Sequence, residues 1–166
     1  MFITFNFLLK YFFNIVGYNP ELSRYVPALF GILSIFSISY LAKIIKKNNS
    51  YLLLLFLVSF NVYLIKYSQE LRVYSVVVFM TSVALIFFFK LTINSKKKNN
   101  ALYQISLTFS LITLILLHPF TLIIFFSIVL FWIIFYIKFK KVLSSINYCL
   151  LAVSFFSIFY LIFYFK

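Results

Sequence analysis

Residues 67–74 read YSQELRVY, a short polar stretch between two apolar runs at residues 51–65 and 73–89. The stretch contains Glu70 and Arg72, one of only two acidic residues and one of only two arginines in the chain. The other acidic residue and the other arginine also lie close together in the sequence. In a chain with so few carboxylates and guanidinium groups, the places where they occur together are the strongest indication of a functional site.

The composition of the whole chain indicates an integral membrane protein. Of its 166 residues 65% are hydrophobic, 23% aromatic and only 10% charged, whereas a soluble domain is nearer half apolar and a quarter charged. The net charge of +13 does not indicate nucleic-acid binding, because the lysines cluster at the ends of apolar runs, as topology determinants do. The single cysteine, Cys149, excludes a disulfide within the chain, and we interpret it as a small buried residue.

The first 16 residues are apolar except for Asn6, Lys10 and Asn14. These three positions are four residues apart and therefore share one face of a helix. We expect residues 1–16 to form an amphipathic helix in the membrane interface; the alternative is part of a truncated first span. Residues 17–24, with a glycine and a proline, are expected to form a loop.

Six apolar runs follow, and each is predicted to be a helix, because lipid offers no partner for unpaired backbone groups. The predicted fold is a single all-α integral membrane domain over residues 1–166, with an interfacial helix at 1–16 and about six transmembrane helices within 25–165. The runs cover residues 25–45, 51–65, 73–89, 101–117, 120–137 and 142–165.

The lysines predict how the chain is oriented. Ten of the fifteen basic residues lie at the ends of the first, third and fifth runs. The positive-inside rule places these ends on the cytoplasmic side. Both acidic residues, both arginines and the only histidine then lie on the extracytoplasmic side of a plasma (inner) membrane. The ten residues are Lys43, Lys46, Lys47, Lys90, Lys96, Lys97, Lys98, Lys138, Lys140 and Lys141.

Arginine near lipid usually marks a bound anion or a buried pair, and its planar fork suits phosphate and carboxylate. Glu21 and Arg24 are three residues apart and could meet on one helical turn. The alternative is a local ion pair that only fixes the loop. If residues 70–72 are extended, Glu70 and Arg72 point the same way.

Around this second pair, Tyr67, Gln69 and Tyr74 add hydroxyl and amide groups. The preceding run is short, so we expect residues 61–67 to dip partly into the membrane, where polar backbone is tolerated only beside a cavity or protein. An ordinary solvated loop is the alternative. His118, before Pro119, is either a hydrogen-bonded cap or a metal ligand, although one histidine and one glutamate do not complete a site.

Two segments resemble a known family. Residues 17–31, GYNPELSRYVPALFG, resemble the "G-x-x-E-x-x-x-R-x-P-S-x-x-x-G" region, with variable spacing, of polytopic GT-C glycosyltransferases. Residues 67–75, YSQELRVYS, resemble their "Y-S-Q-E-x-R-x-Y-S/A" segment. The most similar group comprises the aminoarabinose, rhizobial lipid-A and protein O-mannosyl transferases, and the resemblance covers roughly residues 1–135.

The resemblance implies transfer of a sugar from a polyprenyl-phosphate carrier to an extracytoplasmic acceptor, with inversion at the anomeric carbon. It implies membrane lipids as further partners, no nucleic acid, and a divalent metal ion as the cofactor. The arginines would face the lipid phosphate and the tyrosines would line the sugar or carrier pocket. The implied substrate-binding residues are Arg24, Tyr67, Gln69, Glu70, Arg72 and Tyr74, and the implied metal ligands are Glu21 and His118.

The sequence departs from the family in one respect, because it contains no aspartate. The family's general base is an aspartate in the first extracytoplasmic loop, so we expect it, with the first span, to lie upstream of Met1 in a longer protein. Two alternatives remain. One is a non-catalytic fragment or pseudoenzyme subunit. The other is a lipid or small-solute transporter, which would favour broken helices at mid-membrane in two repeated halves; no such repeat is found.

Overall fold

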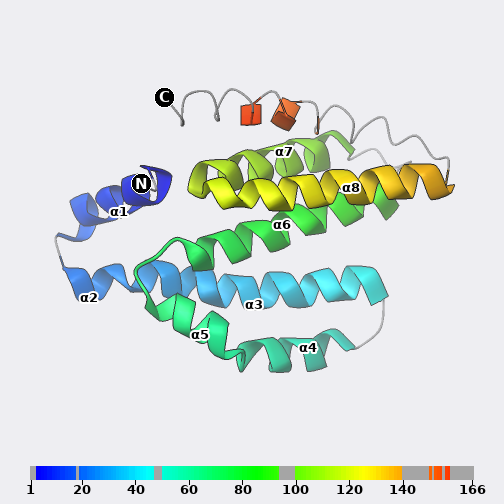
Figure 1. The fold of residues 1–166 in the computed structure, drawn as a ribbon. Helices are drawn as coiled ribbons and strands as arrows, with labels where there is room; N and C mark the ends of the chain where they lie inside the picture. Colours follow the sequence, from blue (N-terminus) through cyan, green and yellow to red (C-terminus); the bar gives the residue numbers. More distant parts are fainter. Residues whose placement is uncertain are drawn as a thin grey trace.

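The computed structural model describes residues 3–17, 19–46, 50–93, 100–139, 150, 152–154 and 156–157, and every element within them is helical (Figure 1). The predicted all-α class is therefore confirmed for this part of the chain. The elements are α1 (Ile3–Val16), α2 (Pro20–Ser23), α3 (Tyr25–Lys46), α4 (Ser50–Ser59), α5 (Val62–Gln69), α6 (Tyr74–Ile93), α7 (Asn100–Leu117), the 3-10 helix η1 (Pro119–Thr121) and α8 (Leu122–Phe139).

The long helices run back and forth between two ends of the molecule (Figure 1). One end carries the N-termini of α3, α6 and α8 and the C-termini of α5 and α7; it includes both arginines, and we name it the arginine end. The opposite end carries the C-termini of α3, α6 and α8, and we name it the lysine end. Of the lysines predicted to gather there, Lys47, Lys96, Lys97, Lys98, Lys140 and Lys141 lie outside the described residues.

Two described helices are long and apolar enough to cross a membrane, over Glu21–Ile45 and Tyr74–Ile93. A third candidate is the pair Tyr51–Ser59 and Val62–Gln69, bent by 55°. The helices over Ala101–Leu117 and Pro119–Ile134 are apolar but shorter. The described residues thus contain two or three candidate spans where the sequence predicted five. The sixth predicted run, 142–165, lies mostly outside them, as does Cys149.

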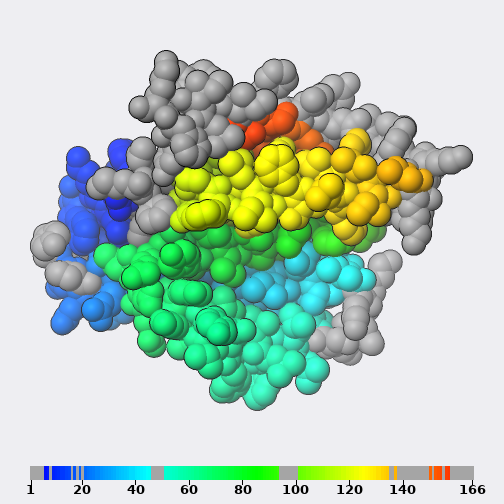
Figure 2. Space-filling view, viewed as in Figure 1, coloured from blue at the N-terminus to red at the C-terminus, as the bar shows by residue number. Residues whose placement is uncertain are grey.

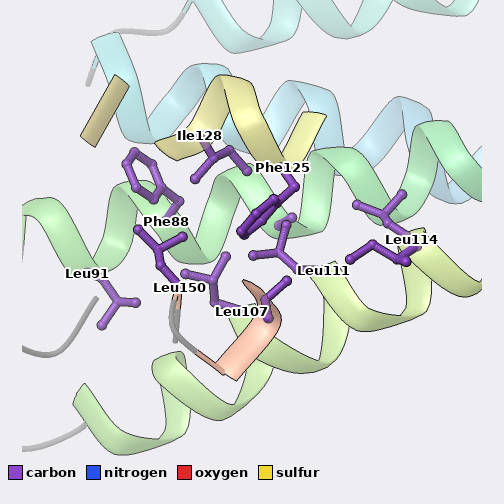
Figure 3. Packing of buried hydrophobic residues seen from close by; sticks show 11 residues of the cluster. Phe88, Leu91, Leu107, Leu111, Leu114, Phe125, Ile128 and Leu150 are labelled. Atoms are coloured by element: carbon purple, nitrogen blue, oxygen red, sulfur yellow. The ribbon is translucent and has the colours of Figure 1, made fainter. Parts of the chain in front are cut away.

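A hydrophobic core joins α6, α7 and α8 (Figure 3). Leu107, Leu111 and Leu114 recur at helical spacing along one face of α7 and are almost completely buried, as expected for a helix that packs on one side. Phe88 of α6 and Phe125 of α8 close the core from the other helices. This packing fixes the spacing of the three helices and of the turn between α7 and α8.

The contact between α3 and α6 is made of smaller side chains. The hydroxyl groups of Ser37 and Ser82 share a hydrogen bond across the two helices, and Ser34 donates to the carbonyl of Gly31 at 2.6 Å. Ser34 and Ser82 are buried. Small residues at helix contacts let two backbones approach closely, and here they bring α3 and α6 side by side in the same direction.

Helices α4, α5 and α8 lie on the face of the molecule seen in Figure 2, and each exposes large apolar side chains. Phe56, Val62 and Phe126 are 60%, 73% and 58% exposed. Monomeric soluble proteins rarely expose contiguous apolar patches of this kind. The exposed surface is therefore compatible with a membrane protein whose outer helices contact lipid.

Helix α1 confirms the prediction of a helix within residues 1–16. Asn6, Lys10 and Asn14 are all exposed, whereas Leu9 is buried against α6 and α7. The polar stripe thus faces away from the protein, as an interfacial helix requires. The helix ends at Gly17, whose N–H donates to the carbonyl of Phe13 at 2.9 Å and whose φ of +85° favours glycine.

Two predicted loops proved partly helical. Within residues 17–24, α2 forms one turn because the Asn19 side chain accepts hydrogen bonds from two backbone N–H groups and Pro20 occupies the first turn. Within residues 61–74, Asn61 caps α5 in the same way, so Tyr67 and Gln69 belong to a helix. Only residues 70–73 form the turn between α5 and α6.

Candidate functional site

The arginine end holds the two segments that the sequence analysis singled out. Residues 17–31 supply α2 and the first turns of α3, and residues 67–75 supply the end of α5 and the start of α6. Both segments lie at this end of the molecule, and the start of α6 lies beside the end of α7 (Figure 1).

The two segments touch at Gly31 and Ser68. A Cβ atom built on Gly31 would lie 2.6 Å from the Cβ of Ser68, a separation that real Cβ atoms do not reach. Glycine is therefore required at this point for the backbone of α3 to lie against α5. The contact sets the position of the residues that follow Ser68, including Glu70 and Arg72.

Glu70 and Arg72 form an ion pair, with 3.4 Å between Arg72 Nε and a Glu70 carboxylate oxygen. Glu70 itself has extended backbone angles, φ −82° and ψ 137°, but the Arg72 N–H donates to the Glu70 carbonyl at 2.7 Å. Residues 70–72 therefore form a tight turn, not the extended segment that the sequence analysis considered. The Arg72 side chain is 65% exposed and the Glu70 side chain 32%. The pair thus lies at the surface, where the guanidinium remains accessible to a further anion.

A row of aromatic rings crosses the arginine end. The rings of Tyr67 and Tyr74 lie 5.1 Å apart, the Tyr74 and His118 rings 6.5 Å apart, and the Phe120 ring stacks on His118 at 5.1 Å. These distances lie within the range in which aromatic pairs attract each other. The row joins α5, the start of α6 and η1, and we name it the aromatic row.

His118 is the N-cap of η1. Its Nδ1 accepts a hydrogen bond from the Phe120 N–H at 3.1 Å, which requires Nδ1 to be unprotonated. Burial lowers the pKa of His118 below its usual value of 6.5, since desolvation disfavours the charged form. Both effects keep the imidazole neutral. Of the two roles that the sequence analysis considered, a hydrogen-bonded cap and a metal ligand, His118 has the first.

A pocket of about 270 Å³ opens beside the aromatic row. Tyr74 and Val77 of α6 form one wall, and Thr121 and Ile124 form the other. The Thr121 hydroxyl donates to the backbone carbonyls of Leu114 and His118, at 2.6 Å each. These bonds fix the turn that carries the aromatic side chains lining the pocket, His118 and Phe120.

Glu21 and Arg24, unlike Glu70 and Arg72, do not form an ion pair within the described residues. Glu21 lies in the first turn of α2 and Arg24 at its end, and both are exposed. In the part of the chain that the structure describes, no ion pair joins them. The two side chains therefore do not meet on one helical turn, and the alternative of a local ion pair that fixes the loop is also wrong. The Asn19 cap holds that loop instead.

Within the described ranges no group of three or more His, Cys, Asp and Glu side chains could hold a metal ion. The predicted pair of Glu21 and His118 would therefore need ligands from elsewhere. In His118, Nδ1 is already engaged by the backbone of Phe120, so any metal would have to bind through Nε2.

Sequence reasoning overlooked several residues at this end. Phe120 and Thr121 follow the His-Pro pair, and the pattern of a capping residue before proline at the first helical position could have indicated an ordered turn there. Nothing in the local sequence indicates that Gly31 and Ser68 touch, because that contact depends on how α3 and α5 pack.

Comparison with protein-family models, curated protein sequences and solved structures found no match for this chain. The family resemblance therefore rests on the two motif segments of the sequence.

Proposed function

We propose that this chain is a membrane glycosyltransferase of the GT-C type that moves a sugar from a polyprenyl-phosphate donor to an extracytoplasmic lipid, glycan or protein acceptor. The observation that carries the proposal is the contact between Gly31 and Ser68. It places the two segments that resemble the family against each other, although 37 positions separate Gly31 from Ser68 along the chain. This proximity supports a common role for the two segments.

In this proposal the six apolar runs each cross a plasma membrane and the arginine end faces the extracytoplasmic side. Arg72 and Arg24 attract the phosphate of the lipid carrier, because an arginine fork suits phosphate oxygens. Positive charge held near the departing phosphate stabilises the charge that develops during transfer. The exposed Arg72 guanidinium is placed for this role.

The pocket beside the aromatic row receives the sugar or the first part of the carrier. Tyr67 and Tyr74 offer ring faces and hydroxyl groups, and Gln69 and Glu70 offer hydrogen-bonding groups next to them. Abstraction of a proton from the acceptor requires a carboxylate within hydrogen-bond reach. The sequence has no aspartate, the residue that serves as general base in the family that the chain resembles.

That missing base favours a second candidate, a non-catalytic membrane subunit that binds the same lipid phosphate without reacting. The two candidates share the binding site and differ only in turnover. A binding assay therefore tests the site, and a transfer assay separates the candidates.

The binding test uses the full chain in lipid nanodiscs and a short-chain polyprenyl monophosphate as the probe. Arg72→Gln is expected to weaken binding by about tenfold or more, the usual effect of losing a charge-assisted hydrogen bond. Loss of the fold is not expected, because an exposed ion pair contributes at most about 1 kcal/mol to stability. Lys66→Gln, an exposed cation in the last turn of α5, is the matched control.

Equal binding by the parent chain, Arg72→Gln and Lys66→Gln would overturn the site. Where binding depends on Arg72, the chain is then supplied with polyprenyl-phosphate-linked mannose or aminoarabinose and an extract of acceptors. If the parent chain consumes the donor and Arg72→Gln consumes less of it, the result supports the enzyme hypothesis. Binding without consumption assigns the chain to the non-catalytic class.

A further inference from the structure

A row of tyrosine rings and lysine side chains crosses four helices near the lysine end. The Lys43 ammonium of α3 lies 5.0 Å from the centre of the Tyr51 ring of α4. The Lys90 ammonium of α6 lies between two rings, 5.0 Å from Tyr40 of α3 and 5.5 Å from Tyr103 of α7. Tyr40 and Lys43 are three residues apart on α3, so they lie on neighbouring turns of one face. We name these five residues the tyrosine–lysine row.

The two ammonium groups of the row lack a carboxylate. The only acidic side chains in the sequence, Glu21 and Glu70, lie at the arginine end. Within the described part of the chain no acceptor takes a hydrogen bond from Lys43 or Lys90. A ring face attracts a cation but leaves its three N–H donors available. The carbonyl groups at the ends of α3 and α6 supply only partial negative charge.

The row also has the composition of a membrane interface. Tyrosine is enriched where lipid headgroups meet the hydrocarbon, since its ring is apolar and its hydroxyl is polar. Lysines near an anionic membrane surface are attracted to it individually. Here the rings hold the ammonium groups in place, so binding costs less side-chain freedom than binding to mobile lysines would.

We propose that the tyrosine–lysine row is a binding site for the phosphate of an anionic phospholipid. The lipid supplies the negative charge that the chain itself does not contain at this end. The site is independent of the proposed sugar transfer, because it lies at the opposite end of the helices. Its effect is to hold the lysine end at headgroup level and to select anionic lipids from the bilayer.

The chain contains its own reporter for this site. Trp132 is the only tryptophan, and its neighbour Phe131 contacts the rings of Phe88 and Phe89 at 5.7 and 6.0 Å. Lys90 follows directly. Brominated lipids quench tryptophan fluorescence at short range, so quenching of Trp132 reports which lipids gather at this level of α8, beside the α6 residues that precede Lys90.

The experiment places the full chain in phosphatidylcholine nanodiscs with a minor share of brominated phosphatidylglycerol or of brominated phosphatidylcholine. The parent chain is expected to be quenched more strongly by phosphatidylglycerol. Lys90→Gln and Lys43→Gln should each reduce this preference by about fivefold, the weight of one lysine at an anionic surface. Lys90→Arg keeps the cation between the rings and should keep the preference.

Lys66→Gln removes the same charge at the arginine end and should leave the preference unchanged. An equal loss in Lys66→Gln and Lys90→Gln would overturn the site, because it would show general attraction to net charge. No preference in the parent chain would overturn it as well. In a second measurement, inorganic phosphate or chloride is added at the same ionic strength. If phosphate displaces the brominated phosphatidylglycerol more strongly than chloride does, the row binds a soluble anion and not a lipid.

Discussion

The arginine end and the lysine end are held by different interactions. At the arginine end side chains bind backbone as well as one another: Asn19 and His118 cap helices, in addition to the contacts of the aromatic row and the ion pair. At the lysine end side chains hold side chains, as Lys90 does between two tyrosine rings. Backbone-directed bonds fix loops at defined positions, which a binding site for one ligand requires. Contacts between lysine and tyrosine side chains suit a surface at the level of the lipid headgroups.

The largest effect on stability should come from Gly31→Ala. The new Cβ would meet Ser68 Cβ at 2.6 Å, and overpacking of this kind costs about 1–3 kcal/mol. Ser68→Gly removes the opposing atom, so the double variant should recover much of that loss. Denaturant unfolding of the two single variants and the double variant in detergent measures the coupling free energy.

Gly17→Ala is the control for this cycle. Its new Cβ would meet nothing within 4 Å, but its φ of +85° still makes the substitution unfavourable, by about 1–2 kcal/mol. Ser68→Gly should not relieve that cost. A coupling near zero between positions 31 and 68 would mean that α3 and α5 do not approach as described.

A smaller effect is expected from pH, and only at the arginine end. The pKa of His118 is lowered by burial in the folded chain, so the unfolded chain takes up the proton first as the pH falls. The stabilisation that neutral His118 contributes to the folded chain is therefore complete above pH 6.5, and it decreases as the pH falls below that value. Thermal unfolding in detergent between about pH 7.5 and about pH 5.5, the range in which histidine titrates, should show the decrease.

His118→Asn supplies the matched control for the pH effect. Asparagine keeps an N-cap acceptor without a titrating ring, so this variant should lose the pH dependence and keep the helix. His118→Ala should instead cost about 1 kcal/mol at neutral pH through the lost cap. An unchanged pH dependence in His118→Asn would assign the effect to another group.

The smallest effect should come from the lysine end. Tyr103→Leu removes one ring from Lys90, and cation–π contacts at exposed sites are worth about 0.5–1 kcal/mol. Tyr103→Phe keeps the ring face and should be nearly neutral. In a Lys90→Met background the two variants should differ less, since the cation is gone. A difference that persists in that background would mean that packing against Phe87, whose ring lies 6.1 Å away, is the cause.

Several features of the fold followed from local chemistry. The polar spacing of Asn6, Lys10 and Asn14 predicted a surface helix, and all three side chains are exposed on α1. The spacing of Glu70 and Arg72 placed their side chains within reach of each other, and they form an ion pair, although across a tight turn and not in the extended segment considered. Both predictions depend only on residues close in sequence, which periodicity and backbone geometry can relate.

Predictions at helix ends were less successful. Residues 17–24 were expected to be a loop, but Asn19 starts a helix there. Residues 61–67 were expected to dip partly into the membrane; Asn61 starts a helix there after a bend of 55°, and the dip itself stays a prediction. The capping residues were visible in the sequence. The apolar pattern around them was too short to show that a new helix begins, because a helix of one or two turns is stabilised mainly by its packing.

The sequence by itself determined that the chain is helical and strongly apolar and that its lysines cluster at the ends of alternate apolar runs. These properties follow from composition and local pattern. Only the tertiary structure decided which segments meet: Gly31 with Ser68, Tyr74 with His118, and Lys90 with Tyr40 and Tyr103. The physical reason is the range of each interaction. Helix formation is set within a few residues, whereas these contacts join positions far apart and depend on how small residues let the helices approach.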